Sequence, residues 1–155
     1  MIRYVLAALL AVAVVSVAGL ALDDGAADNT ERVLQAGISD IEDAAIELSE
    51  NEELSPAEHP DPRRVVDLRV PAGSLTETGV SHVEIEPVDE ADASFARYVL
   101  DDGTYHREIL DVRIVYRDAT DTRTTEIHGS GTQTLMLVLL PDEDGDPVVV
   151  VDPPE

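Results

Sequence analysis

The chain has 155 residues, of which 33 are acidic and 10 basic, so that its formal net charge is −23 at neutral pH. All the basic residues are arginine, and the sequence contains neither lysine nor cysteine. A chain of this length accommodates one small domain. The absence of cysteine excludes disulfides, thiolate metal sites and a cysteine nucleophile. Because so negative a surface repels phosphates, we expect no nucleic-acid partner.

The acidic residues alternate with short apolar runs and do not gather in blocks, as RVVDLRV (64–70) and REILDVRIVY (107–116) illustrate. This alternation favours a folded domain over a disordered acidic tail. Repulsion among like charges destabilises a compact state, but in molar salt the Debye length falls to about 3 Å. The lysine-free composition resembles that of proteins from salt-accumulating haloarchaea, and we expect the fold to need high salt.

An uncharged, mostly apolar run occupies residues 5–22, after a single arginine and before two aspartates. Its 18 residues would form about 27 Å of helix, close to the roughly 30 Å thickness of a bilayer core. We therefore expect a transmembrane anchor over 1–22, with membrane lipid as its partner through 5–22. The alternative is a signal segment that is cleaved near Ala21. In both cases the positive-inside rule leaves the N-terminus in the cytoplasm and the remainder outside the cell.

Residues 23–50 have the periodicity of an amphipathic helix, with Gly25 as a possible interruption of the path from the apolar run. Apolar side chains recur at steps of four and three residues along one side, and acidic side chains occupy the other. Two interpretations remain open: the apolar side packs on its own domain, or it is an interaction seam that contacts another subunit. The second interpretation would permit a homo-oligomer. The seam consists of Leu34, Ile38, Ile41, Ala45 and Leu48.

An acidic, proline-containing linker follows over 51–63, and from 64 to 155 the apolar pattern changes to the period of two that is typical of strands. Asp102-Gly103 and the sequence PDEDGDP (141–147) are turn signals between strands. We therefore predict an α+β protein, in which the two helical segments precede a small antiparallel β-sheet or sandwich. LMLVLL and VVVV should be central or covered, with the amphipathic helix as the natural cover. The predicted strands are 64–70, 80–87, 95–100, 104–116, 122–128, 134–140 and 147–151.

Motifs that would indicate chemistry are weak. The histidines are isolated in the sequence, at His59, His82, His106 and His128. HGSGT (128–132) lacks the following helix that a nucleophile elbow requires. PDEDGDP does not meet the EF-hand pattern. We therefore expect no enzymatic activity, no cofactor and no specific metal.

The layout, an apolar helix running into an amphipathic helix and then a small β domain, resembles that of archaeal type IV pilins and pilin-like proteins. The segments RVVDLRVPAGSLTETGVSHVEI (64–85) and LMLVLLPDEDGDPVVVV (135–151) resemble a family of uncharacterised haloarchaeal membrane-anchored proteins. Pilins have a short basic leader before the apolar run, and MIRY at residues 1–4 departs from that pattern.

Together these resemblances imply a non-enzymatic single-span protein with an extracellular domain. It would be a structural or accessory part of a pilus-like or secretion-type surface assembly, with other envelope proteins as partners. The alternatives are a monomeric envelope-associated binding module and a secreted soluble protein.

Overall fold

The computed structural model describes the backbone of residues 2–56, 58–88 and 91–152, and within these ranges it describes side chains from residue 25 onward. The described residues form one helix and eight strands, which confirms the predicted α+β class. These elements are α1 (Ile2–Asn51), β1 (Arg63–Val70), β2 (Val80–Pro87), β3 (Ser94–Leu100), β4 (Tyr105–Leu110), β5 (Ile114–Tyr116), β6 (Thr125–Ile127), β7 (Gly131–Pro141) and β8 (Pro147–Asp152).

Helix α1 is a single element of 50 residues that passes through Gly25 without a break. The predicted interruption at Gly25 is therefore wrong, and the boundary between the segments 1–22 and 23–50 lies inside one helix. Among the residues whose side chains are described, no helix is long and apolar enough to cross a membrane. The predicted anchor over 5–22 lies outside those residues.

The strands form two four-stranded sheets. The first has the order β1-β7-β8-β5, and the second has the order β4-β3-β2-β6. All neighbouring pairs are antiparallel except β5 and β8, which are parallel. As the apolar pattern of LMLVLL and VVVV predicted, β7 and β8 occupy the two central positions of the first sheet.

The predicted strand 104–116 is wrong as a single element, because the structure divides it between the two sheets. Its first part is β4, at the edge of the second sheet, and its last part is β5, at the edge of the first. Leu110, Val112 and Ile114 are all buried across the division. The alternation of period two therefore continues while the chain crosses from one sheet to the other, so the sequence carries no sign of the crossing.

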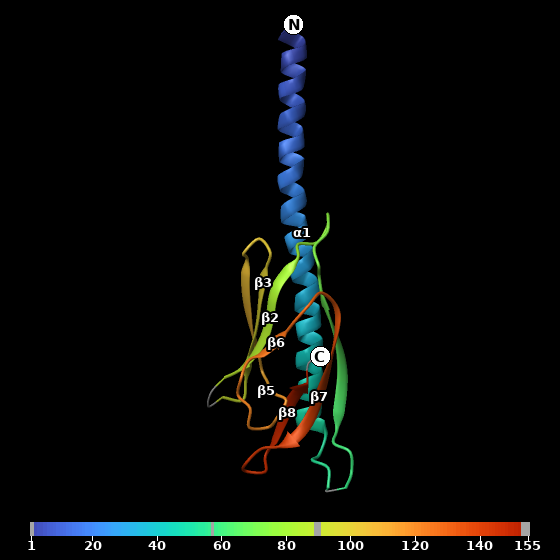
Figure 1. Ribbon diagram of the computed structural model, residues 1–155, viewed down its shortest axis with the longest axis vertical. Coiled ribbons are helices and arrows are strands. Elements are labelled where there is room, and N and C mark those ends of the chain that lie inside the picture. The colour runs from blue at the N-terminus through green and yellow to red at the C-terminus, as the bar shows by residue number, and fades with distance from the viewer. Residues whose placement is uncertain (1, 57, 89–90, 153–155) are drawn as a thin grey trace.

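The core lies where the two sheets enclose the C-terminal half of α1 (Figure 1). It combines apolar side chains of the helix with inward-facing side chains of both sheets, such as Leu137 of β7 and Ile85 of β2. The predicted role of the helix as a cover is thus confirmed on this side. The outer face of β8 is covered differently: Val148 and Val150 form a second cluster with Val115, against which Ala119 of the β5–β6 connection packs.

Candidate functional site

The predicted interaction seam is part of the protein's own core. All five of its residues are at most 3% exposed and belong to one cluster with the sheets, namely Leu34, Ile38, Ile41, Ala45 and Leu48. The helix contacts β1, β7 and β8 along this side. The interpretation as a contact with another subunit is therefore wrong, because side chains enclosed by their own domain have no surface left for a partner.

The polar side of α1 also contacts the β domain, at the edge of the second sheet. Nε2 of His106 on β4 lies 2.8 Å from Oε1 of Glu31, and the backbone N–H of Asp111 donates to Oε1 of Glu42 at 2.7 Å. The ring of His106 stacks on that of buried Tyr98, with 4.9 Å between their centroids. Sequence reasoning missed these contacts, because an acidic helix face ordinarily indicates solvent.

This polar contact changes the acidity of Tyr98. Burial, together with the nearby carboxylates of Glu108 and Glu31, raises the pKa of its phenol to about 12. The phenol therefore stays neutral over the physiological pH range. Its ring packs against that of His106, where the sheet contacts the polar side of the helix.

Two of the isolated histidines come together on the second sheet. His82 of β2 and His128, which follows β6, line one cavity of about 350 Å³. Each lies beside a carboxylate of its own segment: Nε2 of His82 is 2.7 Å from Glu84, and Nε2 of His128 is 3.3 Å from Glu126. The sequence signal was H-x-E on one strand and E-x-H on its neighbour. Among the described residues, however, no three histidine or carboxylate groups are placed to hold one metal ion. His59 lies exposed in the connection between α1 and β1.

The other two motifs build turns. In HGSGT, Gly129 and Gly131 have positive φ angles of 86° and 94°, and Gly131 begins strand β7, so the geometry is that of a turn before a strand. In PDEDGDP, Oδ1 of Asp142 accepts the backbone N–H groups of Asp144 and Asp146, each at 2.9 Å. That carboxylate closes the β7–β8 turn, a usual use of aspartate.

The junction where α1 leaves the β domain is tied to the β1–β2 loop, residues 71–79, which lies beside the helix there (Figure 1). The hydroxyl of Thr30, which is completely buried, donates to the carbonyl of Thr78 at 2.7 Å. The N–H of Thr78 donates to the carbonyl of Ala26 at 3.3 Å, and the side-chain amide of Asn29 donates to Thr76 at 3.2 Å. One turn of the helix is thereby fixed to one loop.

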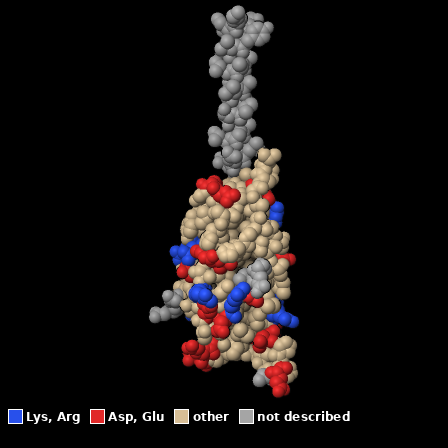
Figure 2. Space-filling view, viewed as in Figure 1, with Lys and Arg blue, Asp and Glu red and all other residues tan. Residues whose placement is uncertain are grey.

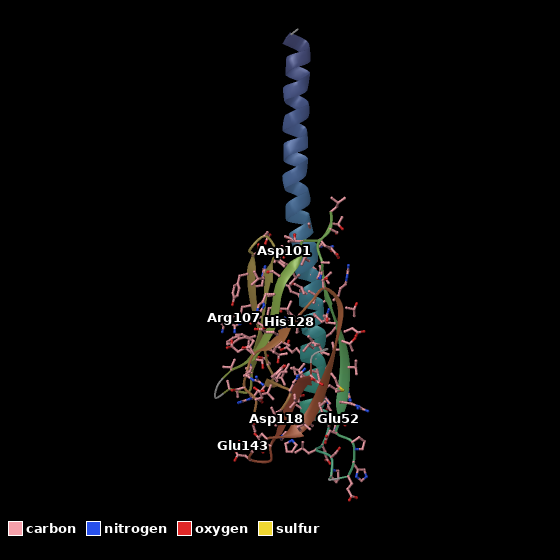
Figure 3. The ribbon with its side chains drawn as sticks, in the orientation of Figure 1. Glu52, Asp101, Arg107, Asp118, His128 and Glu143 are labelled. Carbon is pink, nitrogen blue, oxygen red and sulfur yellow. The ribbon has the colours of Figure 1, made fainter. Side chains whose placement is uncertain are left out.

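The β3–β4 turn supports the same junction. The N–H of Asp101 donates to the carbonyl of Gly79 at 2.9 Å, and Figure 3 places Asp101 at the end of the domain from which the helix emerges. A side chain at Gly79 would collide with the carboxylate of Asp101. The carboxylate of Asp101 would therefore have to rotate away from any larger residue at this position.

A family model described as a domain of unknown function, DUF7311, matches residues 1–154. The chain belongs to the DUF7311 family. Because the match covers the apolar run, the rest of α1 and all eight described strands, the unit that defines DUF7311 is the helix together with its β domain. A comparison with curated proteins finds no match. A comparison with solved structures finds none either.

Proposed function

We propose that this protein is a non-enzymatic, single-span membrane protein that carries its β domain on the outer side of the membrane of a halophilic archaeon. The observation that carries the proposal is the continuity of α1. One helix includes the apolar run 5–22 and then supplies the centre of the β domain's core. The N-terminal half of the helix projects from the domain (Figure 1).

The length of α1 supports a role for its N-terminal part in the membrane and for its C-terminal part in the core of the β domain. The helix has 50 residues, which correspond to about 75 Å, and the part from Ala26 to Asn51 accounts for about 38 Å of that. The remaining length is comparable to the roughly 30 Å hydrocarbon core of a bilayer. A rod with one end in lipid and the other inside a small β domain resembles the layout of archaeal pilins.

We assign the protein a structural or accessory role in a pilus-like or secretion-type surface assembly. Support comes from the use that the fold makes of its titratable side chains. The His106–Glu31 pair ties helix to sheet, and Arg97 of β3 binds Glu84 and Glu86 of β2. These pairs join neighbouring elements of the fold to one another.

A monomeric envelope-associated binding module is the second candidate. One observation favours it: the seam of α1 lies in the core, so assembly through that seam is not available. Contacts within an assembly would have to use the projecting half of the helix or the outer faces of the sheets.

Fractionation of cells, followed by N-terminal sequencing of the native protein, tests the proposal. We expect the intact chain in the membrane fraction, and release by Val14→Asp, which places a carboxylate in the apolar run at a cost of about 3 kcal/mol. Asp24→Asn, beyond that run, is the matched control and should leave the chain in the membrane. Recovery from the medium with a new N-terminus close to Ala21 would contradict the anchor and favour a secreted protein. If the anchored chain cross-links to no other envelope protein in intact cells, the monomeric module is the correct alternative.

A further inference from the structure

The tip of the β1–β2 loop presents an uncharged apolar side chain to solvent. Leu75 is 90% exposed, more than any other large hydrophobic residue among those whose side chains are described. The loop, PAGSLTETG over 71–79, contains a single carboxylate, that of Glu77. This carboxylate is only 15% exposed and lies 2.8 Å from the guanidinium of Arg69. In a chain with 33 acidic residues, such a tip is an unusual surface.

The loop is held in one conformation by its own backbone. The N–H of Ser74 donates to the carbonyl of Glu77 at 2.7 Å, and the N–H of Val80 donates to the carbonyl of Pro71 at 3.1 Å. Gly73 has a positive φ of 91°, and a side chain there would press on Gly79. The leucine is therefore presented by a closed, ordered loop, so its insertion into an apolar phase would require little further ordering.

The place of the loop on α1 decides what the leucine can reach. The loop is bonded to Ala26, Asn29 and Thr30. Measured along the helix from Leu22, the last residue of the apolar run, Ala26 is about 6 Å away and Thr30 about 12 Å. The headgroup layer on each side of a bilayer is roughly 5–8 Å thick. From its bonded position the loop extends along the helix toward the N-terminal end, where Figure 2 shows uncharged atoms at its tip.

We propose that the β1–β2 loop is a second membrane contact, with Leu75 inserted into the lipid interface beside the anchor helix. This inference rests on the proposed function, because it requires the apolar run to lie in the bilayer. A helix that crosses a membrane alone can tilt and rotate, and flanking contacts restrict these motions. With the loop in the interface as well, the β domain has one fixed orientation on the membrane.

Lipid-borne quenching of a fluorophore tests this contact on the full chain, reconstituted in molar KCl into vesicles of equal parts phosphatidylcholine and phosphatidylglycerol. The chain has no cysteine, so single substitutions give specific labelling. A polarity-sensitive fluorophore at Thr76→Cys reports on the loop while Leu75 stays in place. Glu143→Cys, on the β7–β8 turn at the opposite end of the domain (Figure 3), is the control for a site far from the membrane. Val14→Cys reports on the anchor.

We expect several-fold more quenching by headgroup-level quenchers at Thr76→Cys than at Glu143→Cys, and a decrease toward the Glu143→Cys value when Leu75→Ser is added. Quenching at Val14→Cys together with none at Thr76→Cys overturns the inference and leaves the anchor intact. If Val14→Cys is not quenched either, the anchor and the proposed function fail together. Protection of Thr76→Cys from aqueous iodide without quenching by lipid would indicate a protein contact instead, and also overturns the inference.

Discussion

Replacement of Ile41 by alanine tests whether the apolar side of α1 is the core of this protein. Ile41 is completely buried and belongs to the cluster that joins the helix to both sheets. Truncation of a buried isoleucine to alanine removes apolar contacts and leaves a cavity, and the cost in unfolding free energy is about 2–5 kcal/mol. Because Ile41 lies between two sheets, neighbouring side chains cannot readily close the cavity, and we expect a value in the upper half of that range.

The measurement is thermal unfolding of the full chain in detergent and molar KCl, followed by far-UV circular dichroism. For a protein of this size, 1 kcal/mol corresponds to about 2–4 °C in Tm, so the expected decrease is about 7–20 °C. Ser39→Ala is the matched control, because Ser39 is exposed on the same helix. We expect its Tm to stay within a few degrees of the wild-type value, as is usual for exposed positions.

The contrary result is easy to recognise. If the seam were an interface between subunits, Ile41→Ala would leave the melting of the β domain unchanged and would weaken association. A wild-type Tm for Ile41→Ala, with a smaller mass by light scattering, would refute the assignment of the seam to the core.

Three further predictions concern backbone, charge and pH. Gly37→Ala should lower Tm, because a Cβ there would lie 2.6 Å from Cδ1 of buried Leu68. Gly25→Ala should raise Tm, because a Cβ there has no atom within 4 Å and alanine has a helix propensity that is better by roughly 1 kcal/mol. Cooperative melting should be lost below a few tenths molar salt, since a net charge of −23 is then poorly screened; melts that are identical in dilute and molar KCl would contradict this. The pKa of Tyr98 is about 12 in the folded protein and about 10 in an unfolded chain. The contribution of this residue to the free energy of unfolding should therefore be fully present below pH 10 and decrease as the pH rises toward 12. Unfolding by guanidinium chloride, measured between pH 10 and pH 12, should show this decrease for the wild type and not for Tyr98→Phe.

The periodicity of apolar residues predicted the helix and most strands of this fold, but it did not predict which elements pack against one another. The steps of four and three from Leu34 to Leu48 require that one side of the helix be covered, and the structure covers it. The same steps are equally compatible with a cover from another subunit, because an apolar stripe indicates burial without indicating by what. Only the arrangement of the two sheets around α1 decides between these possibilities.

The contacts that sequence reasoning missed all depend on pairings distant in the chain. Glu31 and His106 are 75 residues apart, and Glu42 and Asp111 are 69 apart. His82 and His128 come to one cavity only because β2 pairs with β6. No local pattern marks such a pair in a chain where carboxylates are so frequent. The crossing between β4 and β5 escaped prediction for a related reason, since a period of two continues when the strand changes sheets.

Because α1 lies in the core, the packing that stabilises the β domain also sets the direction in which the projecting half of the helix leaves it. If the seam side chains packed loosely, the helix could shift against the sheets, and the direction in which its projecting half leaves the domain would vary. The bonds of Thr30 and Asn29 to the β1–β2 loop act where the helix leaves the domain. The next helix residue, Glu31, pairs with His106 of β4. A destabilised core should therefore disturb the orientation of the β domain on the membrane at temperatures at which the domain is still folded. On this reasoning, Ile41→Ala at temperatures below its Tm should already weaken lipid quenching at the loop, whereas Ser39→Ala should not.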